Sequence, residues 1–410
     1  MKPLNLSQVN FTKRADVFNS GSGIFNPAGS DVKTLRGADQ IIGNQSLKSA
    51  FGFEVFANAV AINAGAISAA DISAAATVNT DGIENKGSIA TNRGRDVVRG
   101  TATAEVIASA NAVSNAIAYA NKLDTGAIAA TFANVNVDAI ANGINNSGKI
   151  GTGRGSDSVD GELVASLTAV ATAEANGLAI VEGIAKAPVN QSLIAFADAI
   201  AVSLANASII ATGIKNVGGE IVTGKGGDTI SAIATSDSNT LSEATARAGT
   251  AATPENEAIA TTVAVAIAEA QDTAIAIDNT QGIIRMGSGK DTITATATGS
   301  ESYGIFGGTI QTGDGADTVD ASSFGGGVNI KMGKGKDFVE GFGDATVNGG
   351  NGFDILSLDS NSFEDFNISL GGNNNKVNFE QNGIIMDTTR FEQFNFSNGS
   401  FTYDELVAKL

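Results

Sequence analysis

A short glycine–aspartate loop recurs eight times along this chain, and this repeat limits the possible folds more than any other feature. Its clearest copy is TGKGGDTI at 223–230, in which Gly224 and Gly226 lead to Asp228 and then to the apolar Ile230. The aspartates of the eight copies are Asp39, Asp96, Asp157, Asp228, Asp291, Asp317, Asp337 and Asp354. Repetition of this kind predicts stacked, similar units rather than a conventional globular domain.

Each part of the loop has a physical role. Glycine permits backbone turns that larger residues resist and lets carbonyl oxygens converge, and the aspartate adds an anionic oxygen. The apolar residue two positions later is expected to begin a short strand and to point inward. Glycine and aspartate are also common in ordinary β-turns, which would explain a single copy. Eight copies in phase favour a repeated oxygen site for a hard cation such as Ca²⁺.

These loops resemble the nonapeptide of the RTX (repeats-in-toxin) family, G-G-x-G-x-D-x-U-x, which forms a parallel β-roll with Ca²⁺ held between successive turns. The resemblance implies that several Ca²⁺ ions are bound by the glycine-loop carbonyls and the aspartate carboxylates. The implied ligands are Gly94, Asp96, Gly153, Gly155, Asp157, Gly224, Gly226, Asp228, Gly287, Gly289, Asp291, Gly313, Gly315, Asp317, Gly333, Gly335, Asp337, Gly350, Gly352 and Asp354. Leu35 and Asn92 replace the first of the two glycines in the first two loops, so the resemblance leaves open whether the Asp39 loop binds metal.

Long alanine-rich segments separate the early loops. From Asp291 onward the aspartates are 17 to 26 residues apart, whereas the earlier ones are 57 to 71 apart. Residues 102–120 carry alanine at every even position except Val106 and Ser114. Alanine favours helix, but an alternation this long, with many β-branched residues, indicates strands.

Two arrangements of these strands fit the pattern. Each arm could form a coil of its own, or each unit could be one wide, flattened coil that runs out, turns, runs back and ends in the loop. The first arrangement would separate successive loops by roughly 14 Å, and the second stacks them about 4.8 Å apart. We expect the second, because in the family that the loops resemble a calcium ion is shared by adjacent turns.

The C-terminal region has a different composition. Alanine becomes rare after Leu356 and phenylalanine becomes frequent, which predicts a compact cap. Thr402 and Glu405 form a capping box, so a short final helix should begin at Tyr403. The tail resembles the uncleaved C-terminal signal of RTX proteins that leave the cell by type I secretion.

The predicted fold is all-β: a parallel β-solenoid, or β-roll, in which wide alanine-rich coils taper to short RTX-like coils. The expected organisation is an N-terminal cap at 1–30, wide coils at 31–290, short coils at 291–356, and a C-terminal β-rich cap with a short helix and secretion signal at 357–410.

The second arms are apolar on both faces, which usually means burial on both. The residues concerned are Ile194, Phe196, Ile200, Val202 and Leu204 in one arm and Ile259, Val263, Val265 and Ile267 in the next. Either residues 1–50 form a third internal layer over this face, or a partner subunit covers it. The open ends of a solenoid must likewise be capped or pair with another molecule.

Composition limits the classes of function that this chain could have. The chain has no His and no Cys, which argues against most acid–base, zinc and disulfide chemistry. Its net charge of −18 argues against nucleic acid as a partner, and no segment predicts an N-terminal signal peptide or insertion into a membrane. We expect a secreted, extracellular or surface-associated calcium-binding structural protein that self-associates in a matrix, surface layer, sheath or filament. A calcium-dependent adhesin or carbohydrate-binding module is the alternative, and no enzymatic activity is expected.

Overall fold

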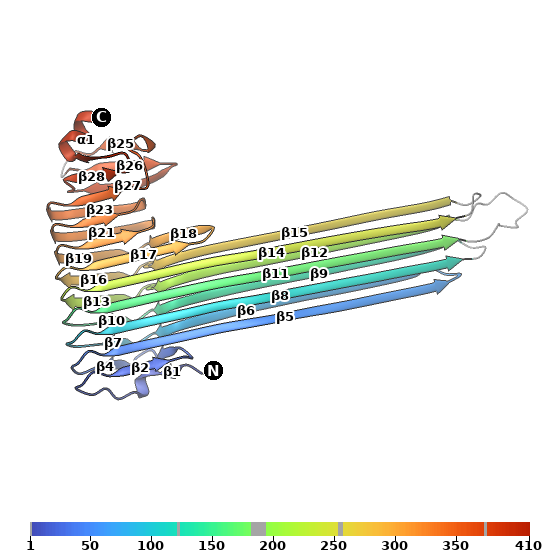
Figure 1. The fold of residues 1–410 in the computed structure, drawn as a ribbon, viewed down its shortest axis with the longest axis horizontal. Coiled ribbons are helices and arrows are strands. Elements are labelled where there is room, and N and C mark those ends of the chain that lie inside the picture. Colours follow the sequence, from blue (N-terminus) through green and yellow to red (C-terminus); the bar gives the residue numbers. More distant parts are fainter. Residues whose placement is uncertain (1, 121–123, 182–193, 253–256, 373–374) are drawn as a thin grey trace, which may run out of the picture.

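The protein has the shape of an L, formed by a column of stacked coils and a long flat blade that projects from the lower part of the column (Figure 1). This computed structural model describes residues 2–120, 124–181, 194–252, 257–372 and 375–410. The blade consists of the distal parts of eight long strands. They are β5 (Gln40–Ile62), β6 (Ala66–Asn85), β8 (Val97–Ala120), β9 (Thr125–Asn146), β11 (Ser158–Val181), β12 (Ile194–Lys215), β14 (Thr229–Ala252) and β15 (Glu257–Asp278).

The fold is the predicted all-β parallel solenoid. One sheet of the blade has the order β5-β8-β11-β14 and the other has the order β6-β9-β12-β15, and every neighbouring pair is parallel. β8 therefore pairs with the outgoing arms of the coils on either side, and β9 pairs with the returning arms. This confirms one wide coil per unit and excludes the arrangement in which each arm is a separate coil.

Alanine fills the interior of the blade. Ala104, Ala108 and Ala112 of β8 and Ala129 and Ala133 of β9 belong to one buried cluster between the two sheets, and each is fully buried. The alternation arises because successive strand residues point to opposite faces. Side chains this small let the sheets lie closer than the usual separation of about 10 Å.

Glycine pairs mark the neck where the blade joins the column. A Cβ atom added to Gly100 would lie 2.1 Å from the carbonyl oxygen of Gly143, and the same contact occurs between Gly43 and Gly82 in the coil below. No side chain fits between the sheets at this level, so the neck requires glycine. The long arms therefore leave the column as one thin double layer.

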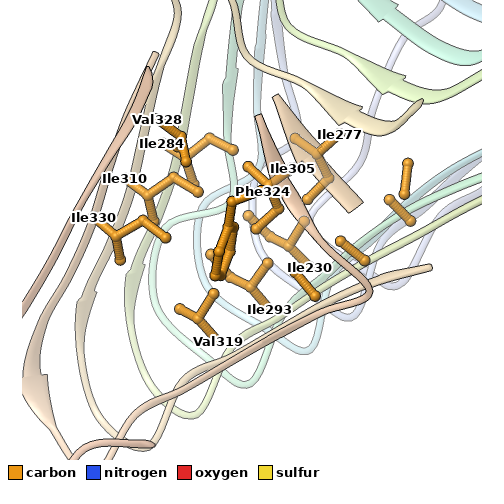
Figure 2. Packing of buried hydrophobic residues seen from close by; sticks show 14 of the residues in the cluster. Ile230, Ile277, Ile284, Ile293, Ile305, Ile310, Val319, Phe324, Val328 and Ile330 are labelled. Atoms are coloured by element: carbon orange, nitrogen blue, oxygen red, sulfur yellow. The ribbon is translucent and has the colours of Figure 1, made fainter. Parts of the chain in front are cut away.

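Above the blade the coils are short. They are formed by β16 (Ile283–Ser288), β17 (Thr292–Thr298), β18 (Glu301–Phe306), β19 (Thr309–Gly315), β20 (Thr318–Ala321), β21 (Phe324–Gly335), β22 (Phe338–Glu340), β23 (Gly343–Gly352) and β24 (Ile355–Leu358). In the lower coils β7 (Ser88–Ala90), β10 (Lys149–Gly151) and β13 (Glu220–Lys225) complete the column. Ile230, Ile293 and Val319 stack along one wall and face Ile284 and Ile310 of another, as Figure 2 shows.

Each end of the column has a cap. The lower cap consists of β1 (Leu4–Asn5), η1 (Leu6–Gln8), β2 (Val17–Ser20), β3 (Ile24–Asn26) and β4 (Asp31–Lys33). The upper cap consists of η2 (Phe363–Asp365), β25 (Asn367–Leu370), β26 (Val377–Gln381), β27 (Ile384–Thr389), β28 (Gln393–Phe396), β29 (Gly399–Thr402) and α1 (Tyr403–Lys409). The antiparallel pairs of the upper cap enclose the buried rings of Phe379, Phe391 and Phe394. The predicted final helix is confirmed, with Thr402 and Glu405 forming its capping box.

Of the two alternatives for covering the apolar face of the second arms, the third internal layer formed by residues 1–50 is wrong. β1 to β4 lie at the foot of the column, and β5 is itself an arm of the blade. The side chains of Phe196, Ile200 and Val263 on the outer face of the blade are 37%, 43% and 44% exposed. The described residues of the N-terminal region therefore do not return over the blade, and no described residue covers this apolar face.

Candidate metal centre

The eight loop aspartates form one continuous file along the column. In seven successive steps, from Asp39 up to Asp354, the backbone N–H of each aspartate donates to Oδ1 of the aspartate in the next coil, at 2.8–3.0 Å. All eight side chains are at most 2% exposed. The file brings together every aspartate predicted as a ligand, and it includes Asp39, whose loop lacks the first glycine.

Two rows of stacked glycines lie beside the aspartates. Gly224 and Gly226 have φ values of 105° and 145°, a region in which side chains are strained. A Cβ atom on Gly226 would lie 1.4 Å from the carbonyl oxygen of Gly155 in the coil below, and one on Gly224 would lie 1.8 Å from that of Gly153. Most of the other predicted glycines also have positive φ, whereas Gly94 and Gly315 do not. The loops need glycine because consecutive backbones almost touch, which concentrates carbonyl oxygens along one line.

The second carboxylate oxygen of each aspartate has no partner. Oδ2 of all eight residues is buried and accepts no hydrogen bond. Burial raises the pKa of Asp291 to about 7, and the neighbouring carboxylates of Asp317 and Asp228 act in the same direction. Burial likewise raises the pKa of Asp157 and of Asp337 to about 6, against a hydrogen bond from the neighbouring backbone that lowers it. The pKa is also raised, chiefly by burial, for Asp96, Asp228, Asp317 and Asp354.

A buried carboxylate with one unsatisfied oxygen needs either a proton or a cation. The donor set here, carboxylate and carbonyl oxygens without sulfur or nitrogen, matches the preference of Ca²⁺. No group of three or more Asp, Glu, His or Cys side chains gathers at one point in the described parts of the chain. Each coil contributes one carboxylate, so an ion bound here would take its remaining ligands from the glycine-row carbonyls of adjacent coils.

The upper end of the file carries a residue that the sequence pattern did not reveal. The N–H of Asp354 donates to Oε2 of Glu392, 2.8 Å away, in the upper cap. Glu392 therefore occupies the place that the aspartate of a further coil would take. It follows no loop signature, since the residues around it read TRFEQF, and only the fold brings it to the file.

A second buried ladder consists of asparagines. Each lies just before the turn that leads into one of the short column strands β4, β7, β10, β13 and β16. Its members are Asn26, Asn85, Asn146, Asn216 and Asn279, and each Nδ2 donates to Oδ1 of the next at 2.6–2.7 Å. The one sequence signal for it is the asparagine that recurs in segments such as GIENKGSI and GINNSGKI. Because each amide in this ladder is partnered, it stabilises the stack and leaves no binding capacity free.

Comparison with protein-family models, with curated proteins and with solved structures finds no match to this chain. The class defined by the fold is that of all-β parallel solenoids. In the part of the chain that the structure describes, no helix is long and apolar enough to cross a membrane.

Proposed function

We propose that this chain is a secreted, calcium-binding structural protein that folds and self-associates when it binds Ca²⁺. The observation that carries the proposal is the file of eight buried aspartates, each with an unpartnered Oδ2 beside rows of glycine carbonyls. A file of ionised carboxylates inside one column is unfavourable unless cations compensate it. Calcium is the cation that best suits oxygen donors of this kind.

Calcium binding would then be coupled to folding. Only the stacked coils bring the carboxylates and carbonyls together, so an ion with affinity for the folded state stabilises that state by mass action. A chain of this composition would stay unfolded where calcium is scarce and would fold where it is plentiful. Export through an uncleaved C-terminal signal, with an extracellular or surface location, is the part of the proposal that rests on the RTX resemblance.

The first test is a calcium titration of chelator-treated protein, followed by far-UV circular dichroism and light scattering. The proposal expects the β signal and the scattering to rise together. Asp228→Asn, which removes one charge from the file and keeps the side-chain shape, should shift the midpoint to higher calcium. Asp320→Asn is the matched control, because Asp320 lies on an exposed outward position of β20. A β signal that is complete in chelator and insensitive to calcium would refute calcium-dependent folding.

A calcium-dependent binding module for a surface or a carbohydrate is the second candidate. The outer face of the β5-β8-β11-β14 sheet favours it, because this face carries a groove lined by Asn58, Asn115, Asn176, Leu178 and Arg247. The side chain of Asn176 donates to Asn115, which donates to Asn58, at 3.0 and 2.8 Å. Calcium-dependent folding without any rise in scattering, together with binding to a glycan array, would favour this candidate over self-association.

A further inference from the structure

The upper edge of the blade is a long strand without a neighbour. β15 pairs with β12 over its whole length on one side, but on its other side it pairs with β18 only from Thr273 to Asp278. On this second side, residues 257–272 have no strand beside them among the described residues. This free edge is about 50 Å long at the usual rise per residue.

The free edge is exposed on both faces. Every residue from Glu257 to Gln271 is exposed, including the alanines that point toward β14. Outward-facing Ile259, Val263 and Ile267 are 50%, 44% and 43% exposed. They lie beside the equally apolar outer residues of β12, so the edge borders a continuous apolar surface, and such surfaces mark interaction sites.

The edge has little of the usual protection against pairing with other chains, since Glu257 and Glu269 are the only outward charges of residues 257–272. Natural edge strands are shielded by lysine, proline, bulges or inward-pointing charges. The segment EAIATTVAVAIAEAQD at 257–272 contains neither lysine nor proline, and its register with β12 is continuous. Its inward charge, Asp272, lies at the column end, where the side chain accepts from the N–H of Ser238 at 3.1 Å.

We propose that this edge pairs with the same edge of a second copy of the chain, with the two β15 strands antiparallel. The inference rests on the self-association in the proposed function and names the surface responsible. The free backbone N–H and C=O groups of an unpaired strand can be satisfied by another unpaired strand. A second copy brings such a strand of identical length. The two outer apolar surfaces would then become continuous across the joint.

The position of the column determines the orientation in which a second copy can pair. A second copy placed above the blade in the same direction would put its own column where β16 to β24 already stand (Figure 1). A copy turned end for end avoids this clash, because its column lies beyond the tip of the first blade. The two L-shaped molecules would then nest, each column beside the other blade's tip.

The charges along the edge favour the same orientation. Val265 is the middle residue of 258–272, and antiparallel pairing centred on it sets Val265 beside Val265 of the copy and Val263 beside Ile267. Glu269 then faces Thr261 and Glu257 lies opposite Thr273 at the end of the free segment, so no carboxylate faces another. Parallel pairing in register would set each glutamate beside its own copy, and like charges directly opposite are destabilising.

Single-cysteine variants test this geometry directly, because the chain has no cysteine of its own. Val265→Cys, at the middle of the edge, should form an intermolecular disulfide when the calcium-loaded full chain is oxidised. Ile259→Cys, near the end, should not, because antiparallel strands hold it roughly 40 Å from its copy. Val202→Cys is the matched control: Val202 pairs with Val265 in register, one strand further from the edge. Its copy would be three strand spacings away, about 14 Å, too far for a disulfide.

Each other pattern would overturn the inference. Equal cross-linking of Val265→Cys and Ile259→Cys would mean parallel pairing, and equal cross-linking of Val202→Cys would mean that the blades pack face to face. No cross-linking at any position would mean that this edge does not pair.

Charge variants give an independent readout. Val265→Lys should abolish a species of twice the chain's 41.2 kDa in multi-angle light scattering, and Val202→Lys should preserve it. Circular dichroism of the same samples separates this result from the proposed function. A calcium-induced β signal in a chain that stays monomeric would refute the pairing and leave calcium-dependent folding standing.

Discussion

Asp291→Asn should stabilise the column without calcium and destabilise it with calcium. Asp291 is fully buried, its Oδ1 accepts from the N–H of Asp228 at 2.8 Å, and its Oδ2 has no partner. Asparagine keeps the accepting oxygen and removes the charge. The substitution therefore isolates the electrostatic contribution of one member of the file.

The raised pKa of Asp291 sets the size of the expected change in folding free energy. Burial raises the pKa of Asp291 from 3.8 to about 7, and each pKa unit corresponds to about 1.4 kcal/mol. The full shift is equivalent to about 4 kcal/mol of destabilisation when the carboxylate is ionised and no cation is bound. The effective dielectric constant around buried charges in proteins is higher than that of a dry interior, which lowers the cost of the charge, so we expect about 2 kcal/mol.

The sign follows from proton linkage. A carboxyl whose pKa is higher in the folded state binds its proton more tightly there, so stability falls as pH rises from 3.8 through about 7. In chelator, the β signal of the wild-type protein should therefore grow as the pH is lowered from 8 to 4.5. Asp291→Asn should move the midpoint of this acid-induced folding toward neutral pH, and in saturating calcium at pH 8 it should lower the midpoint of guanidinium unfolding.

The assay is circular dichroism at fixed pH steps, in chelator and in calcium, with Asp320→Asn as the exposed control. A β signal in chelator that does not change between pH 8 and 4.5 would refute the view that Asp291 and its neighbours are buried charges. A variant that is less stable than the wild-type protein in both conditions would show that the charge of Asp291 stabilises the column even without calcium, and would refute the prediction.

Three further substitutions test other parts of the structure. Gly226→Ala should abolish calcium-dependent folding, since its Cβ would lie 1.4 Å from the carbonyl oxygen of Gly155, whereas Gly21→Ala, in open space, should leave the circular dichroism titration unchanged. Asn146→Ala breaks the asparagine ladder and leaves buried polar atoms unpaired, so guanidinium unfolding should show a loss of about 2–3 kcal/mol. Ala173→Leu overfills the thin interior of the blade, and thermal unfolding should show a loss of about 1–3 kcal/mol.

The repeat made the architecture predictable from the sequence. The phase of the loops fixed the position of each aspartate in the file, and alternation over some twenty residues distinguished strands from helices. The RTX resemblance, which implies stacked loops, then favoured the wide coil, because separate coils would place several strands between Asp157 and Asp228. In parallel solenoids, side-chain parity and loop phase together determine the register.

Other features had no periodic signal. Glu392 reaches the end of the file from a cap that lacks the loop motif. The pairing of Gly100 with Gly143 depends on how closely two sheets approach at the neck, which a single strand's pattern does not encode. Outward residues such as Ile200 and Val263 are apolar whether they face the chain's own core or another molecule, so the sequence predicted a cover without identifying it.

Because the aspartate file lies in the column, the stability of the blade depends on the pairing of its own strands. The file and the isoleucine stacks hold the column together, but the blade extends far from both, and its interior offers only small alanine contacts. Inner strands such as β11 have a strand on each side as well as the opposite sheet. Over residues 257–272 β15 has a described strand on one side only, and even the inward alanines of this part are exposed. The wide coils are therefore held weakly at this upper edge, where pairing with a second copy would bury surface that the described chain leaves exposed.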